Sequence, residues 1–192
     1  MLPKKRLAMR HDKVRFPATT FSAKGMTMNT VHLIAGSTGA GKSTYALKLA
    51  NDLNAVLFSI DVWMDALFAA DKPGDAGYDW YWPRIQRCED RIWDIACQTL
   101  ALGTPAVFDL GLSTRAHREK FRTLAAASGH STHLHYLDAN AATRWLRVEA
   151  RNTEKGQTFS LTVTRGMFDF VESIFEAPDG PELANATVIV SE

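Results

Sequence analysis

The sequence predicts a three-layer α/β/α fold built on a five-stranded parallel sheet. Short apolar runs alternate with helix-like segments after residue 30, and a glycine-rich turn follows the first run. Strands that alternate with helices imply right-handed crossovers and a parallel sheet covered on both faces. We expect strands at residues 31–35, 55–60, 105–108, 132–137 and 187–190. We expect helices at residues 44–53, 62–70, 83–102, 114–127 and 140–151.

The composition is that of an ordinary globular domain that can bury a core. Hydrophobic residues make up 46% and charged residues 22% of the 192 residues, close to the average for soluble proteins. No apolar run approaches the roughly 20 residues that span a bilayer, so we expect a cytoplasmic protein with no membrane contact. Cys88 and Cys97 lack a CxxC spacing, which excludes a disulfide framework and a zinc knuckle.

The first 28 residues form a basic extension ahead of the expected domain at residues 29–192. Seven lysines and arginines precede Asn29, against the single acid Asp12. We expect a disordered extension, or a translation start assigned too far upstream of Met26 or Met28. Binding to nucleic acid or to an anionic surface, and a role as a transit segment, are the alternatives.

The glycine-rich turn matches the G-x-x-x-x-G-K-[ST] pattern between a strand and a helix. Glycines let successive backbone N–H groups point inward at phosphate oxygens, and the following helix adds a favourable dipole. The pattern predicts a P-loop NTPase that binds ATP and Mg²⁺, with Lys42 on the β- and γ-phosphates and Ser43 on the metal. The expected nucleotide-binding residues are Gly36, Ser37, Thr38, Gly39, Ala40, Gly41, Lys42, Ser43 and Thr44.

Two aspartates end predicted strands at the same edge of the sheet, where ligands gather in such folds. Asp109 ends the run Ala-Val-Phe-Asp and is expected to hold the magnesium hydration shell; a turn or helix-capping aspartate is the alternative. Asp61 ends the run Phe-Ser-Ile-Asp and is expected to accept the proton of an attacking hydroxyl. Asp61 also precedes the helix-like residues 62–70, so capping is its alternative role.

Three arginines predict a cationic face on the helix at residues 140–151. The spacing of Arg144, Arg147 and Arg151 places them within an arc of about 60°. Arginines supplied in cis stabilise the charge that spreads over a transferring phosphoryl group. We expect a catalytic lid at about residues 143–165, with a mobile loop at 152–160. A solvated face paired with Glu149 or Glu154 is the alternative.

These motifs together resemble the small P-loop kinases grouped with zeta toxins and chloramphenicol phosphotransferase. The resemblance covers most of residues 30–182 and includes the stretch from Asp109 to Arg115 and the segment from Phe168 to Pro178. It implies a five-stranded parallel sheet, an acid matching Asp61 that acts as base toward the acceptor hydroxyl, and lid arginines that grip the phosphates. Members of this group phosphorylate sugars, antibiotics and nucleic-acid ends, so the resemblance leaves the acceptor open.

Other side chains are weaker candidates. Arg115 and Arg118 follow Asp109 and are expected to touch an anionic part of the substrate, with helix-surface placement as the alternative. An aromatic cluster is expected to pack at the periphery or to stack on an acceptor near Asp61; it comprises Tyr78, Trp80, Tyr81 and Trp82. Structural roles are favoured over metal binding for His130, His133 and His135.

The sequence therefore predicts an ATP-dependent kinase that transfers the γ-phosphate to a hydroxyl of a small molecule. A regulatory P-loop NTPase is one alternative, although the guanine-reading Asn-Lys-x-Asp motif and the Leu-Ser-Gly-Gly transporter signature are missing. A polynucleotide 5′-hydroxyl kinase is the other alternative. We expect a small-molecule partner and do not expect nucleic acid.

Overall fold

A five-stranded parallel sheet forms the middle layer of the protein, in the strand order β2-β3-β1-β4-β5. The structure, a computed structural model, describes residues 29–156 and 162–191. The basic extension at residues 1–28 and part of the expected lid loop, residues 157–161, lie outside the described residues. The strands are β1 Thr30–Ala35, β2 Val56–Ser59, β3 Ala106–Asp109, β4 Ser131–Ala139 and β5 Thr187–Ser191.

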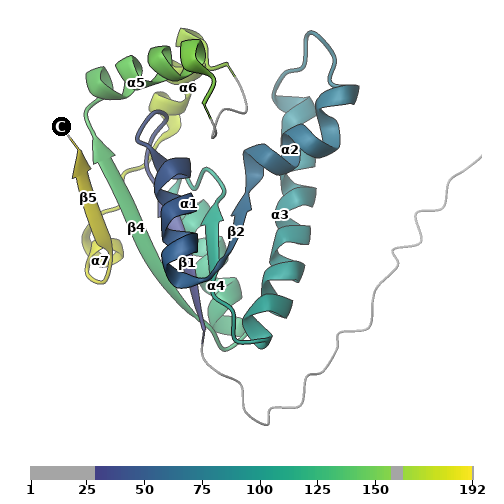
Figure 1. Cartoon of the computed structure of the whole chain (residues 1–192), viewed down its shortest axis with the longest axis vertical. Coiled ribbons are helices and arrows are strands. Elements are labelled where there is room, and N and C mark those ends of the chain that lie inside the picture. Colours follow the sequence, from purple (N-terminus) through teal and green to yellow (C-terminus); the bar gives the residue numbers. More distant parts are fainter. Residues whose placement is uncertain (1–28, 157–161, 192) are drawn as a thin grey trace, which may run out of the picture.

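Helices cover both faces of this sheet, and others lie at the carboxyl ends of the strands (Figure 1). Helix α1 packs on one face, and α3 and α4 pack on the other. The three-layer prediction is therefore confirmed. Among the described helices, none is long and apolar enough to cross a membrane. The helices are α1 Lys42–Leu53, α2 Ile60–Phe68, α3 Tyr78–Ala101, α4 Arg115–Ala127, α5 Ala141–Glu154, α6 Arg165–Ile174 and α7 Gly180–Leu183, with a 3₁₀ turn η1 at Ala69–Asp71.

The central strands are apolar on both faces because each face is covered by helices. Successive side chains of a strand point to opposite faces. Leu33 of β1 therefore packs toward α3 and α4, where it joins Phe108 and Phe121 in one core cluster. Ile34, the next residue, packs toward α1 with Ala46 in the second cluster. The two clusters hold the strand ends in fixed positions for the site.

Helix α3 begins at Tyr78, ahead of the predicted start at Pro83. Proline is tolerated in the first turn of a helix and disfavoured later, which is why the sequence predicts a start at Pro83. A tertiary contact supports the earlier start: the Trp80 ring packs edge-on against Phe68 of α2, with ring centres 6.5 Å apart. Within α3 itself, the Arg84 guanidinium lies 4.1 Å from the centre of the Trp80 ring. The aromatic cluster thus joins α2 to the beginning of α3.

Helices α5 and α6 lie across the carboxyl ends of the strands (Figure 1). Helix α5 continues to Glu154, beyond the predicted start of the lid loop at residue 152. Helix α6 was not predicted as an element. The Asn152 side chain holds the chain before α6, because its amide donates to the carbonyl of Val163 at 2.8 Å and its oxygen accepts from the Val163 N–H at 3.1 Å.

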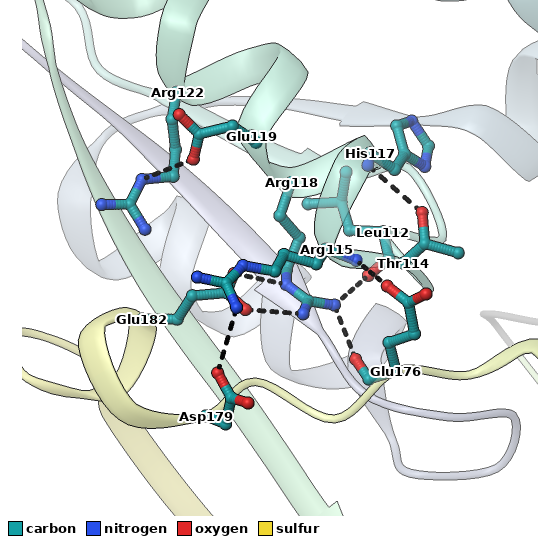
Figure 2. Close-up of polar contacts among 10 residues, drawn as sticks. All are labelled: Leu112, Thr114, Arg115, His117, Arg118, Glu119, Arg122, Glu176, Asp179 and Glu182. Atoms are coloured by element: carbon teal, nitrogen blue, oxygen red, sulfur yellow. Dashed lines mark hydrogen bonds and ion pairs between the residues drawn. The ribbon is translucent and has the colours of Figure 1, made fainter.

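The segment after α6 is fastened to α4 by a buried arginine (Figure 2). Arg118 is fully buried and forms two 2.8 Å hydrogen bonds to the carboxylate of Glu182. It also donates to the carbonyls of Leu112 and Glu176. The expectation that Arg118 contacts substrate is wrong for this arrangement, because its donors are committed inside the protein.

Arg115 lies on the surface beside the same segment (Figure 2). Its guanidinium is 3.6 Å from a carboxylate oxygen of Asp179, and both side chains are more than half exposed. Its backbone N–H donates to the Glu176 carboxylate at 2.6 Å. Neither Arg115 nor Arg118 lines the cavity described below. The structure therefore favours the helix-surface alternative for Arg115.

Removal of the Arg118 side chain should strongly destabilise the fold, because Glu182 would remain buried without its cation. Breaking a buried ion pair from one side costs about 3–5 kcal/mol. We expect Arg118→Met to lower the free energy of unfolding in urea by this amount. Arg122→Met is the matched control on the same helix, since Arg122 pairs with Glu119 at 3.7 Å on the surface, and should cost at most about 1 kcal/mol. Equal effects of the two variants would contradict this role of Arg118.

Candidate functional site

The first turn of α1 has open backbone N–H groups. Its N-cap is Gly41, which cannot cap with a side chain, and the first turn contains no acidic residue. The first N–H groups of a helix have no partner within the helix. Together with the helix dipole they form a site for an anion. The end of the phosphate loop therefore presents free donors where the sequence predicts phosphate binding.

Two glycines let the phosphate loop lie directly against neighbouring backbone. A Cβ atom at Gly36 would stand 2.8 Å from the carbonyl oxygen of Leu137. A Cβ atom at Gly39, whose φ is +81°, would overlap the carbonyl oxygen of Arg144. Larger residues are excluded at both positions. The loop is therefore seated against the end of β4 and the first turn of α5.

A cavity of about 470 Å³ lies over the carboxyl ends of the strands and brings together most of the predicted site residues. Its lining comes from the phosphate loop, β3, the start of α2, and the lid helices α5 and α6. Gly36, Ser37 and Ala40 are buried beneath this surface. The predicted residues that line the cavity are Thr38, Gly39, Gly41, Lys42, Ser43, Thr44, Asp61, Asp109, Arg147 and Arg151.

Asp109 is the last residue of β3 and is nearly buried, at 6% exposure. Its backbone pairs with Ser59 of β2, so the sheet fixes its position. The Asp109 carboxylate and the Ser43 hydroxyl line the same cavity. Hard oxygen ligands of this kind suit Mg²⁺, which is usually held by one or two protein groups together with substrate phosphates. Among the described residues, no group of three or more His, Cys, Asp or Glu side chains could hold a metal without such a partner.

Asp61 lies in the first turn of α2 and does not cap this helix. The N-cap is Ser59, which makes no side-chain capping bond. Solvent reaches the Asp61 side chain from the cavity. The surrounding protein and the nearby Asp109 carboxylate nevertheless raise the pKa of Asp61, against the opposing influence of Lys42 and Arg151. A carboxylate with a raised pKa is suited to accept a proton.

Lys42 lies in the first turn of α1, and its ammonium donates to the carbonyl of Ser37 at 3.1 Å. Burial lowers the pKa of Lys42, while Asp109 and Asp61 counteract this effect. The arrangement holds a cation between the phosphate loop and two carboxylates. Such a cation can neutralise phosphate oxygens without help from solvent.

The three lid arginines share one face of α5, as the spacing predicts, but they do different things. Arg144 is buried and does not line the cavity. Its guanidinium donates to the carbonyls of Ala139 and Thr38 and to the Glu172 carboxylate. A direct catalytic role for Arg144 is therefore wrong for this arrangement. The side chain instead joins the phosphate loop, the end of β4 and α6.

Arg147 and Arg151 line the cavity. Arg151 is close enough to Lys42 and Asp61 to influence the pKa of both. Its Nε atom is buried and has no hydrogen-bond partner among the described residues. A buried donor without a partner is costly, so an anionic ligand that accepts from Arg151 would remove this cost. Arg151 is therefore the lid arginine whose unpartnered donor an anionic ligand in the cavity could use.

The aromatic cluster lies outside the cavity. None of its four residues lines the wall that contains Asp61, and Tyr78 instead stacks on Trp82 with ring centres 5.6 Å apart. The expected acceptor-stacking role near Asp61 is therefore not supported, and peripheral packing describes the cluster.

The histidines of β4 lie in a local hydrogen-bond network. His135 bonds to His32 at 2.9 Å and to the Tyr45 hydroxyl at 2.8 Å. Burial and the two neighbouring histidines lower the pKa of His135 to about 4. These contacts agree with the structural role predicted for His133 and His135.

Several cavity residues were not predicted. Gly111 and Ser113 follow Asp109, within the stretch that carries the family resemblance. Val163 lies inside the predicted lid at residues 143–165 but was not named as a site residue, and Met167 and Val171 belong to α6, beyond that lid. The i, i+4 spacing of Met167 and Val171 is the signal that would have placed them on one helix face.

Comparisons with solved structures agree with this architecture. The APS kinase CysC of Mycobacterium tuberculosis, solved with AMPPNP and APS, is 16% identical, with a TM-score of 0.58 and coverage of 86% of this chain and 90% of that one. A gluconokinase of Sinorhizobium meliloti is 14% identical, with a TM-score of 0.53 and coverage of 84% and 82%. Kti12 of Chaetomium thermophilum, solved with ADP-AlF3, is 11% identical, with a TM-score of 0.63 and coverage of 84% and 89%. At these identities the likeness shows the fold alone.

Sequence comparison gives the family. A search of the curated proteins finds no significant match. The family model described as AAA domain matches residues 31–173, which include the phosphate loop, both aspartates and the lid. The narrower resemblance to zeta toxins and chloramphenicol phosphotransferase remains a prediction. The match covers most of the chain, and the protein therefore belongs to the AAA domain family.

Proposed function

We propose that this protein is an ATP-dependent phosphotransferase that phosphorylates a hydroxyl of a small molecule. The observation that carries the proposal is the convergence of Lys42, Asp61, Asp109 and Arg151 on one cavity at the carboxyl ends of the strands. A nucleotide-binding switch needs the phosphate loop and a metal ligand. It does not need a second carboxylate with a raised pKa in the same cavity, and this is why we favour transfer to an alcohol.

The proposed reaction is an in-line transfer. The acceptor oxygen forms a bond to the γ-phosphorus, the bond from this phosphorus to the β–γ bridging oxygen breaks, and ADP leaves. Asp61 takes the proton of the acceptor hydroxyl. The backbone N–H groups of the loop and Lys42 hold the phosphates, and Arg151 donates to the equatorial oxygens that carry the developing charge.

Asp109 and Ser43 would hold the magnesium ion, because they supply oxygen ligands in the same cavity. When bound, this ion would supply positive charge to the phosphate oxygens. The pairing of β2 with β3 fixes the position of Asp109 and thereby the place where the ion would be held.

The test of the proposal is transfer of label from [γ-³²P]ATP to a panel of small hydroxyl compounds, beside a reaction without acceptor. We expect labelled product with at least one compound. Hydrolysis at the same rate with and without every acceptor would favour the regulatory NTPase instead.

Lys42→Ala should abolish turnover while the fold survives, because Lys42 supplies the side-chain cation of the phosphate loop. Lys48→Ala is the control on the same helix, since Lys48 pairs with Asp52 on the surface. We expect wild-type turnover from this control. Near-normal turnover by a folded Lys42→Ala protein would refute the phosphate-binding assignment.

Asp61→Asn should lower acceptor phosphorylation by about 10²–10⁴ with little change in nucleotide affinity, because it removes the base and keeps the shape. In the wild type, kcat/KM should fall as the pH drops through the raised pKa of Asp61, since only the ionised carboxylate accepts a proton. This acid limb should be missing in Asp61→Asn. The control is Asp65→Asn, an exposed position on α2 outside the cavity. An unchanged acid limb in Asp61→Asn would assign the titration to another group.

Kinetic measurements should distinguish the role of Arg151 from that of Arg144. Arg151→Ala should lower kcat by about 10³, the scale of an arginine that acts in the transition state. Arg151→Lys should rescue poorly, because an ammonium lacks the planar fork of a guanidinium. Arg144→Ala should instead lower the melting temperature and weaken ATP binding, since Arg144 braces the loop. A large kcat loss confined to Arg144→Ala would reverse these two roles.

A further inference from the structure

The lid helix α6 presents an apolar face to the cavity. Met167 and Val171 lie four residues apart on this helix, and both line the cavity together with Val163. The polar side of α6 is elsewhere, where Arg165 pairs with Asp169 at 2.9 Å. We call Val163, Met167 and Val171 the lid wall. It lies in the same cavity as Asp61, the proposed base.

Core packing does not account for the lid wall. Helix α6 buries Phe168, which is 2% exposed and packs on Trp145 with ring centres 5.3 Å apart. Met167 in contrast remains 39% exposed. Apolar surface gains about 25 cal/mol for each Å² removed from water. An apolar ligand in the cavity would obtain this gain against Met167 and Val171.

The cavity draws its cations from the two elements proposed to hold the nucleotide phosphates. Its cations within the described residues are Lys42, Arg147 and Arg151, which come from the phosphate loop and α5. An acceptor at Asp61 would meet two carboxylates, because Asp109 is near enough to raise the pKa of Asp61. The arginines predicted to meet an anionic substrate, Arg115 and Arg118, lie in the contacts with Asp179 and Glu182.

The polar side chains of the cavity belong mainly to the residues proposed to bind the nucleotide and the metal or to act as the base. Outside that set, the Ser113 hydroxyl lines the cavity and donates to the carbonyl of Gly111 at 2.5 Å. A site that selects a sugar uses several hydrogen bonds, each left unpaired when the wrong ligand binds. The lid wall provides apolar contact instead.

We propose that the acceptor is an uncharged alcohol with an apolar body, an inference that rests on the proposed phosphotransfer. Its hydroxyl lies at Asp61, and its apolar part lies against Met167 and Val171. The lid wall thereby selects the class of acceptor, while the phosphate loop and Arg151 serve the nucleotide.

The first experiment compares three acceptors of similar size with [γ-³²P]ATP: 3-phenyl-1-propanol, sorbitol and gluconate. We expect kcat/KM for phenylpropanol to exceed that for the other two by at least about tenfold. Saturation-transfer NMR of the same compounds, with AMPPNP present, measures binding independently of turnover. Preference for sorbitol or gluconate in either measurement would overturn the proposed acceptor class and leave phosphotransfer standing.

The second experiment makes the lid wall polar. Met167→Gln and Val171→Thr should each raise KM for phenylpropanol several-fold and leave KM for ATP unchanged, whereas Met167→Leu, which keeps the side chain apolar, should raise KM for phenylpropanol less than Met167→Gln does. Leu146→Gln is the matched control, because Leu146 is 66% exposed on α5 and does not line the cavity. If the wall variants weaken ATP binding and spare the alcohol, the lid wall belongs to the nucleotide and the proposal is wrong.

The two proposals fail in different ways. Binding of phenylpropanol that depends on Met167, without transfer to any alcohol, would remove phosphotransfer and keep the apolar site. Transfer to alcohols that is indifferent to Met167 and Val171 would keep phosphotransfer and remove the apolar site.

Discussion

The site depends on the close approach of the phosphate loop to the first turn of α5. Gly39 lies so near the Arg144 carbonyl that no side chain fits between them, and Gly36 lies in the same way against Leu137. Close packing of this kind transmits any shift directly, because the interior has no spare space. The position of the phosphate cradle and the position of the lid helix are therefore set together. Arg147 and Arg151, one and two turns along α5, face the cavity as a consequence.

The Arg144 side chain reinforces this contact from the other direction. A guanidinium has donors in a rigid planar fork, so one buried arginine can bind partners on several elements at once. Arg144 uses this geometry to reach Thr38 in the loop, Ala139 at the end of β4 and Glu172 on α6. The Glu172 side chain is 37% exposed, so water can reach this partner. The link to α6 therefore rests on a side-chain carboxylate that solvent reaches, whereas the links to the loop and to β4 rest on backbone carbonyls.

The elements that the sequence predicts well are those governed by local chemistry. The phosphate loop needs glycines at fixed spacing before a helix, and the apolar runs of a buried parallel strand are recognisable in isolation. The partners of the buried arginines, in contrast, lie far away in the sequence. Arg118 pairs with Glu182, 64 residues further along the chain, and helical periodicity places Arg144 beside Arg147 without showing which of them faces a cavity. Helix α6, which decides this, has only 10 residues and was not predicted. Arginines on one face of α5 therefore take different roles. Arg144 is buried by its neighbours and holds elements together, whereas Arg147 and Arg151 face the cavity.

The electrostatics of the cavity link the two carboxylates. Lys42 and Arg151 favour an ionised Asp61, whereas the enclosing protein and Asp109 favour the protonated form and prevail, so the pKa of Asp61 is raised. The influence of the Asp109 charge on the pKa of Asp61 depends on what is bound. Neutralisation of the Asp109 charge by a bound cation would remove its contribution, and the pKa of Asp61 would then fall, because opposite and like charges act on a carboxyl in opposite directions. A bound nucleotide would act in the opposite direction, because its phosphates bring negative charge into the same cavity. Under the proposed function, the ionisation of Asp61 would therefore depend on the balance between the charge of the metal and the charge of the phosphates that surround it.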